Sequence, residues 1–141
     1  TPGVTVFKTD TSNPKLLDEK DWYDVDVITC AAPNLRERPS NRFNQNNGDH
    51  AVKVSDRELL EIHKKRLTRI LDVAALNNAE VVILGAFGCG AFQNKPEVMA
   101  RAAKEVITDY LQVFKTIEFA VYCSPRDDTN LRVFKRVLGM M

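Results

Sequence analysis

Residues 81–94 read VVILGAFGCGAFQN and are the most informative segment of the sequence. Residues 81–84 form a continuous apolar run of strand length that ends abruptly at a glycine. Two more glycines follow closely, and because glycine has no Cβ, backbone N–H groups can converge there and a ligand can approach closely. We therefore predict a ligand-binding loop at residues 85–92. Its candidate binding residues are Gly85, Ala86, Phe87, Gly88, Cys89, Gly90, Ala91 and Phe92.

A helix is predicted to begin directly after this loop. Asn94 is a candidate N-cap, Pro96 suits the first turn, and Glu97 stands where it would complete a reciprocal cap. The apolar stripe of this helix comprises Val98, Ala102, Val106, Tyr110 and Phe114. Its positive end contributes about 0.3–1 kcal/mol to holding an anion, whereas each hydrogen bond to a charged group contributes about 1.5–3 kcal/mol. The natural guest is therefore a diphosphate held mainly by backbone N–H groups.

Strands and helices alternate on both sides of the loop. Further strands are predicted at residues 4–7, 25–30 and 117–122 from apolar and β-branched runs. Ser55 and Glu58 form a capping box before a helix of about five turns, and Asp128 or Thr129 begins a last helix. This order predicts parallel strands covered by helices. We expect a single α/β domain over residues 1–141.

Three loops should meet at one edge of this sheet, because the carboxyl ends of parallel strands lie together and bind ligands there. These loops are residues 31–34, 85–94 and 123–128. Asn34, just past a strand end, is a further candidate for a ribose or backbone contact. Phe87 and Phe92 either cover a ribose or adenine face or pack under the loop into the core, and the sequence leaves both alternatives open.

Two known phosphate-binding motifs differ from this loop. A Walker loop needs G-x-x-x-x-G-K-[ST], and no glycine of the chain is followed by lysine. The Rossmann fingerprint needs G-x-G-x-x-G, and Gln93 stands where the third glycine belongs. A dinucleotide-binding domain that uses residues 88–93 is kept as an alternative hypothesis.

Composition narrows the class of protein. The 20 lysine and arginine residues balance 19 acidic residues, so we expect no direct DNA binding and no membrane binding. No apolar stretch reaches the roughly 18 residues needed to span a bilayer. The three cysteines are widely spaced and lack a C-x-x-C pair, which predicts a reducing, cytoplasmic setting. With only two histidines, we expect no metal site, and we expect no cofactor.

Three elements in the same order resemble a known family. They are VDVITCAAPN at residues 25–34, LDVAALNNAE at residues 71–80 and VVILGAFGCGAFQNKP at residues 81–96. Together they resemble the C-terminal part of microbial-type poly(ADP-ribose) glycohydrolases, a branch of the macrodomain fold. The similarity extends from Val4 to about Leu138. It implies a three-layer α/β/α domain with a mostly parallel sheet, lacking the N-terminal part of the full family domain.

The resemblance also implies a function. In the family, the loop that matches residues 85–92 embraces the diphosphate and distal ribose of ADP-ribose, and the phenylalanine matching Phe87 helps to place the scissile sugar. The family's catalytic Gly-Gly-Gly and Gln-Glu-Glu element precedes this region and is absent from the chain. Glycoside cleavage needs a carboxyl group that protonates the leaving oxygen, and Asp10, Asp24 and Asp26 lie in no such motif. We expect no catalytic residue in this chain and no hydrolysis of poly(ADP-ribose) by residues 1–141 alone.

Several other residues carry competing interpretations. His63 falls on an apolar stripe and is predicted to be a partly buried core histidine rather than a catalytic one. His50 has no recognisable partner acid or nucleophile. Cys89 lacks a general base, which favours an inert thiol. Arg36, Arg38 and Arg42 either meet polymer phosphates or belong to a solvated loop, and the second interpretation is favoured. Asn130 and Phe134 match a D-x-x-N-x-x-x-F pattern of the family and are expected to support the adenine side.

The leading hypothesis is an ADP-ribose-recognising macrodomain of the poly(ADP-ribose) glycohydrolase type. Its partners would be ADP-ribose or poly(ADP-ribose), together with a companion N-terminal fragment or a second copy of the chain, since losing early strands exposes a sheet edge. The alternative is a non-catalytic reader of ADP-ribose or a related nucleotide diphosphate.

Overall fold

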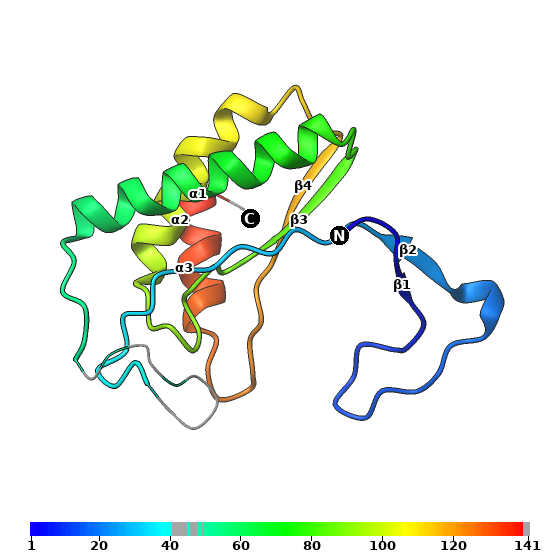
Figure 1. Ribbon diagram of the computed structural model, residues 1–141, viewed down its shortest axis with the longest axis horizontal. Helices are drawn as coiled ribbons and strands as arrows, with labels where there is room; N and C mark the ends of the chain where they lie inside the picture. Colours follow the sequence, from blue (N-terminus) through cyan, green and yellow to red (C-terminus); the bar gives the residue numbers. More distant parts are fainter. Residues whose placement is uncertain (41–44, 46–47, 49, 140–141) are drawn as a thin grey trace.

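The computed structural model describes residues 1–40, 45, 48 and 50–139 of the chain. Figure 1 shows a body of helices and two paired strands, with a separate hairpin at the N-terminal end. The elements are β1 (Val4–Val6), the 3-10 helix η1 (Glu19–Asp21), β2 (Tyr23–Val25), α1 (Asp56–Leu76), β3 (Val81–Gly85), α2 (Pro96–Ile107), the 3-10 helix η2 (Thr108–Tyr110), β4 (Thr116–Ala120) and α3 (Thr129–Leu138).

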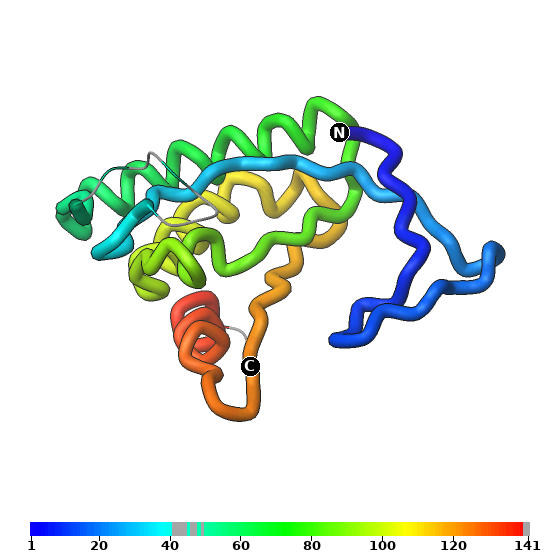
Figure 2. Tube along the Cα trace, turned by 60° about the horizontal axis from the view of Figure 1, so that its bottom comes forward, coloured from blue at the N-terminus to red at the C-terminus, as the bar shows by residue number. Residues whose placement is uncertain are grey.

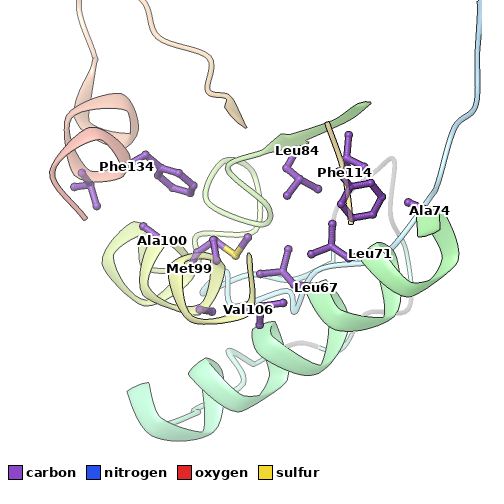
Figure 3. Close-up of a cluster of buried hydrophobic side chains, with 13 residues drawn as sticks. Leu67, Leu71, Ala74, Leu84, Met99, Ala100, Val106, Phe114 and Phe134 are labelled. Atoms are coloured by element: carbon purple, nitrogen blue, oxygen red, sulfur yellow. The ribbon is translucent and has the colours of Figure 1, made fainter. Parts of the chain in front are cut away.

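The parallel strands β3 and β4 form the sheet of the main body. Val82 lies opposite Ile117 and Leu84 opposite Phe119, and all four side chains join one hydrophobic core with the helices. Figure 3 shows side chains pointing into this core from α1 (Leu67, Leu71 and Ala74), from β3 (Leu84), from α2 (Met99, Ala100 and Val106) and from α3 (Phe134). The predicted α/β class and the parallel pairing are confirmed.

The opposite face of this sheet is bare in the described residues. Val81 and Ile83 alternate with the buried residues of β3, and their side chains are 53% and 67% exposed. Because side chains alternate along a strand, these two residues point away from the helices. The described helices therefore form one of the three layers that the family resemblance implies.

Helix α1 follows its sequence signals closely. The Ser55 hydroxyl accepts a hydrogen bond from the Glu58 backbone N–H, and the Ser55 backbone N–H donates to the Glu58 carboxylate, so the predicted capping box is confirmed. Leu67 and Leu71 from its apolar stripe are buried. At 21 residues α1 is the longest described helix, yet no described helix is both long and apolar enough to cross a membrane.

The end of α2 differs from the prediction. The apolar stripe predicted a helix through Phe114, but α2 ends at Ile107 and is followed by the short helix η2 and a turn. Tyr110 and Phe114 still pack together, with ring centroids 6.1 Å apart, and Phe114 is buried. The spacing of four residues arises here from a turn, in which the Val113 N–H donates to the Tyr110 carbonyl, rather than from a longer helix.

The predicted strand at residues 25–30 is wrong in most of its length. Strand β2 ends at Val25 and pairs antiparallel with β1, with Val4 opposite Val25. Pairing continues only to Val27, which exchanges hydrogen bonds with Thr1. Residues 28–30 have the apolar composition of a strand but no neighbouring strand to pair with among the described residues, and a strand is defined by its pairing.

Candidate functional site

The glycine-rich loop is a chain of tight turns at the end of β3. The Phe87 N–H donates to the Gly85 carbonyl at 2.8 Å, and the Cys89 N–H donates to the Ala86 carbonyl at 2.9 Å. The backbone of Gly88 has a φ of +79°, a conformation that side-chain-bearing residues rarely adopt. A Cβ at Gly88 would lie 2.8 Å from the Cβ of Ala32, so glycine is required there for space as well as for conformation.

Gly90 differs from Gly88 because it faces open space. A Cβ built on Gly90 would meet no atom of the described residues within 4 Å. The residue is also exposed. The loop therefore has one glycine that fits tightly against its support and one that borders solvent.

Asn94 fastens the loop to its neighbours. The side chain is 2% exposed, and its Nδ2 group donates to the carbonyl oxygens of Pro33 at 2.7 Å, Gly88 at 3.1 Å and Phe92 at 3.2 Å. The predicted N-cap role is wrong, because Lys95 occupies the N-cap position of α2 and no side chain caps that end. Pro96 does occupy the first turn as predicted.

Further hydrogen bonds join the loop to neighbouring segments of the chain. The Leu35 N–H donates to the Phe92 carbonyl at 3.0 Å, which ties residues 31–34 to the loop. The Asn130 side chain, at the start of α3, donates to the Cys89 carbonyl at 3.5 Å. The predicted meeting of residues 31–34 with the loop at 85–94 is confirmed, and Asn130 contacts the loop directly. The place of residues 123–128 beside them and the adenine-side role of Asn130 stay predictions.

Part of the loop backbone is left with hydrogen-bonding capacity. The N–H groups of Gly88, Gly90, Ala91 and Phe92 donate to no acceptor within the described part of the chain. Backbone N–H groups of this kind need a partner from solvent or from a ligand. These N–H groups are close together in sequence, and α2 begins four residues after Phe92. The loop therefore has the donors that an anion requires.

Two aromatic side chains border the loop in different ways. Phe87 is half-buried, packs against the hydrophobic core and meets the His63 ring edge-on, with centroids 5.8 Å apart. Phe92 is also half-buried, but its ring lies under the guanidinium group of Arg36 at 5.7 Å. Phe87 therefore agrees with the alternative in which the ring packs into the core. The Phe92 ring instead lies against the Arg36 cation at the rim of the loop.

His63 is completely buried beneath the loop, more deeply than the partial burial that we predicted. Neither ring nitrogen has a hydrogen-bond partner among the described residues, and neither does Oδ1 of Asn94. Burial lowers the pKa of His63, and the positive charge of Arg66 acts in the same direction, while the Asn94 side chain opposes the shift. A neutral imidazole therefore supports the loop from below.

Cys89 and Asn34 are less available than their positions suggest. Burial, and secondarily the charge of Glu97, raises the pKa of the Cys89 thiol to about 12, so the inert interpretation fits the structure. The Asn34 side chain donates to the Pro39 carbonyl at 3.3 Å and accepts from the backbone N–H and Nε of Arg36. Asn34 supports its own segment in this structure, and its contact with a ligand stays a prediction.

The remaining candidates are exposed, buried in the core or outside the described residues. Arg38 and His50 are exposed, and Arg42 lies outside the described residues. Phe134, predicted to support the adenine side, is buried in the core and packs against Phe119 at 5.8 Å between ring centroids.

The nearest acidic candidates lie on or beside the N-terminal hairpin. Asp24 accepts from the Thr5 hydroxyl and Asp26 accepts from the Gly3 N–H. Figure 1 shows this hairpin projecting away from the helices and from the loop.

Sequence reasoning missed the part that Asn94 plays beneath the loop. An asparagine before a proline-started helix is a standard capping signal, and nothing in its local sequence separates a cap from a cross-link between loops. The pairing with Pro33, 61 residues away, is a tertiary contact that only the fold reveals.

Comparison with solved structures gives a consistent set of relatives. The chain is similar to the poly(ADP-ribose) glycohydrolase of Deinococcus radiodurans in complex with ADP-ribose, with 30% identity, a TM-score of 0.76, and coverage of 99% of this chain and 51% of that chain. It is also similar to the Thermomonospora curvata enzyme, with 26% identity, a TM-score of 0.77, and coverage of 97% and 45%. No family model matches the sequence, and no curated protein matches it. The predicted resemblance is confirmed, and the chain spans about half the length of these relatives.

Proposed function

We propose that this chain binds the diphosphate of ADP-ribose, or of poly(ADP-ribose), through the loop at residues 85–92. The observation that carries the proposal is the set of loop N–H groups, at Gly88, Gly90, Ala91 and Phe92, that have no acceptor within the described part of the chain. The similar Deinococcus radiodurans enzyme is known in complex with ADP-ribose, which supports the same ligand class here.

Physical chemistry favours an anion at this loop. Each hydrogen bond from an N–H group to a charged oxygen contributes about 1.5–3 kcal/mol, so two or three such bonds contribute about 3–9 kcal/mol before binding costs. Arg36 lies at the rim over Phe92 and adds a cation without entering the loop. Glu97 in the first turn of α2 opposes an anion, but its carboxylate is engaged by Arg136 at 3.4 Å.

Catalysis is not part of the proposal for these residues. Hydrolysis of a glycosidic bond needs a carboxyl group at the scissile sugar, and the acids Asp24 and Asp26 are engaged in the hairpin. The chain therefore acts as the recognition half of a hydrolase or as a reader of ADP-ribose. No release of ADP-ribose from poly(ADP-ribose) is expected above a buffer blank. Release that an Asp or Glu substitution in the chain abolishes would contradict this.

A charge-and-bulk substitution at Gly90 tests the ligand site. Gly90→Glu places a carboxylate at a position with open space, so the fold should persist while diphosphate binding falls by at least about 100-fold, the equivalent of two lost hydrogen bonds. Titration calorimetry with ADP-ribose measures the effect. Gln112→Glu is the matched control, because Gln112 is exposed and lies outside the loop at residues 85–92. This variant should bind ADP-ribose normally.

The same titration separates the alternatives. ADP-ribose binding tighter than ADP supports a site that holds the distal ribose as well as the diphosphate. Tightest binding of NAD would favour the dinucleotide-binding domain, and unchanged affinity of Gly90→Glu would remove the loop from the site. We place the protein in the cytoplasm, in keeping with its free cysteines Cys30, Cys89 and Cys123.

A further inference from the structure

A groove lies between the segment that follows β2 and the free edge of β3. Its volume is about 860 Å³, and it is lined by Val25, Val27, Ile28 and Cys30 on one side and by β3 on the other. Leu67, Ile70 and Ala74 of α1 also line it. Figure 2 shows the segment after β2 lying between α1 and β3 in that view. The groove thus has two walls of extended backbone and a floor of helix side chains.

Both walls carry unpaired backbone. β3 pairs with β4 along one edge only, and β4 is its one partner among the described strands. On the opposite wall, the backbone groups of residues 28 and 29 enter no hydrogen bond within the described residues. An open strand edge presents a row of N–H and C=O groups that accepts another strand. Two such edges facing one groove are suited to an extended segment that pairs with both.

The groove's surface is mostly apolar, with Asp24, Asp26 and Asn77 among its polar lining residues, and it is partly exposed. Val27 and Ile28 are 40% and 41% exposed, and Val81 and Ile83 of β3 are exposed on the open face of the sheet. An isolated polar ligand would leave both edges unpaired, whereas a strand would satisfy the backbone and cover these side chains. β3 has five residues, so a partner strand of about the same length, roughly 17 Å, fits the wall.

We propose that this groove receives a β-strand from the half of the domain that this chain does not cover. The chain spans only about half of its structural relatives, so the other half of such a domain lies outside these residues. One face of the inserted strand would meet α1 and the other would join the exposed side of the sheet. A strand buried on both faces reads as a nearly continuous run of Val, Ile and Leu rather than an alternating one. The partner is therefore a strand of that composition, which converts two separate edges into one continuous sheet.

The test uses the 141-residue chain together with a defined probe. The probe is the part of the Deinococcus radiodurans glycohydrolase that the structural match leaves uncovered, purified separately and mixed with the chain. Amide hydrogen exchange is then read at β3 and at residues 28–30, with and without the probe. We expect a complex on size-exclusion chromatography and at least about tenfold slower exchange of these amides.

A substitution in one wall makes the test specific. Thr29→Pro removes a backbone N–H from the unpaired segment and should weaken the complex by about tenfold, roughly one hydrogen bond with its desolvation. Leu111→Asp, exposed and outside the groove, is the control and should leave the affinity unchanged. Retained exchange protection of α1 and α2 amides shows that Thr29→Pro is folded.

Three results would overturn the proposal. They are the absence of a complex, a complex in which the β3 amides exchange as before, and protection of the groove by self-association of the chain alone. Because no nucleotide is present in this experiment, its outcome is independent of the ADP-ribose proposal.

Discussion

Asn94 shows how one buried amide can organise a loop, because its side chain donates to several carbonyl oxygens at once. Its Nδ2 group donates to carbonyl oxygens of Pro33, Gly88 and Phe92, so two positions of the loop and one of the segment at residues 31–34 converge on one side chain. Carbonyl oxygens that lose their donor inside the protein leave a desolvation cost of about 1–3 kcal/mol each. The loop geometry therefore depends on this side chain as well as on Gly88.

Asn94→Asp tests this dependence. Aspartate has nearly the same shape but no N–H donor, and it places a buried carboxylate against three carbonyl oxygens. We expect the free energy of unfolding to fall by about 2–4 kcal/mol, measured by urea denaturation. Asn13→Asp, on an exposed stretch, is the control and should change it by less than about 0.5 kcal/mol. A small loss at both positions would mean that Asn94 is not a cross-link.

His63 gives the loop a pH dependence whose sign follows from its burial. Burial lowers the pKa of His63 below its ordinary value of 6.5, so the unfolded chain binds the proton more readily than the folded one. The stability that comes from the neutral ring is fully present above about pH 6.5 and is lost as the pH falls through the lowered pKa. Arg66 is the charged group that adds to this shift.

His63→Leu should remove that dependence. The imidazole makes no hydrogen bond to the described residues, so leucine of similar size should cost little at pH 7.5. Between pH 7 and pH 5 the free energy of unfolding should decline for the native chain and stay nearly flat for the variant, apart from the carboxylates. Parallel curves for the two proteins in denaturant titrations would contradict the assignment.

Among the helices and strands, sequence signals predicted an element correctly where residues close in sequence determine it. The capping box of Ser55 and Glu58 depends on near neighbours and is present in the structure. The strand predicted at residues 81–84 is also present, because β4 supplies its pairing partner. Residues 25–30 have strand composition, yet they form a strand only to Val25 because pairing partners decide the rest. The loop site was predictable from its glycines. The hydrogen bond that Asn94 donates to Pro33 was not, because the two residues are 61 positions apart in the sequence.

Ser55→Ala provides the test at this scale. Removing the hydroxyl abolishes the cap of α1, so the free energy of unfolding should fall by about 1 kcal/mol. The Ser55 hydrogen bonds also lower the pKa of Glu58, so the difference between the two proteins should shrink as the pH drops below 4.5 and the carboxylate becomes protonated in both. Thermal melting over pH 3.5 to 7 measures it, with Ser12→Ala as an exposed control. An equal loss at both sites, or no loss, would show that the cap is dispensable.

At the scale of the whole molecule, the helices with β3 and β4 and the N-terminal hairpin are held by different means. The helices, β3 and β4 share one hydrophobic core, and among the described residues none before Leu60 contributes to it. The hairpin is joined by backbone pairing of β1 with β2 and by Thr1 with Val27. Stability is therefore expected to be uneven, with the hairpin opening at lower free energy than the core.

A ligand at the loop should separate these two regions. Saturation with ADP-ribose at about 100 times its dissociation constant adds roughly 2.7 kcal/mol to the stability of whatever unfolds together with the site. Core amides of α1 and α2 should exchange about 100-fold more slowly under these conditions, because their opening disrupts the loop. Amides of β1 and β2 should exchange unchanged, since their opening leaves the loop intact. Equal slowing of both sets of amides would show that the hairpin and the core unfold as one unit. In that case the opening of either part would also disrupt the ligand-binding loop.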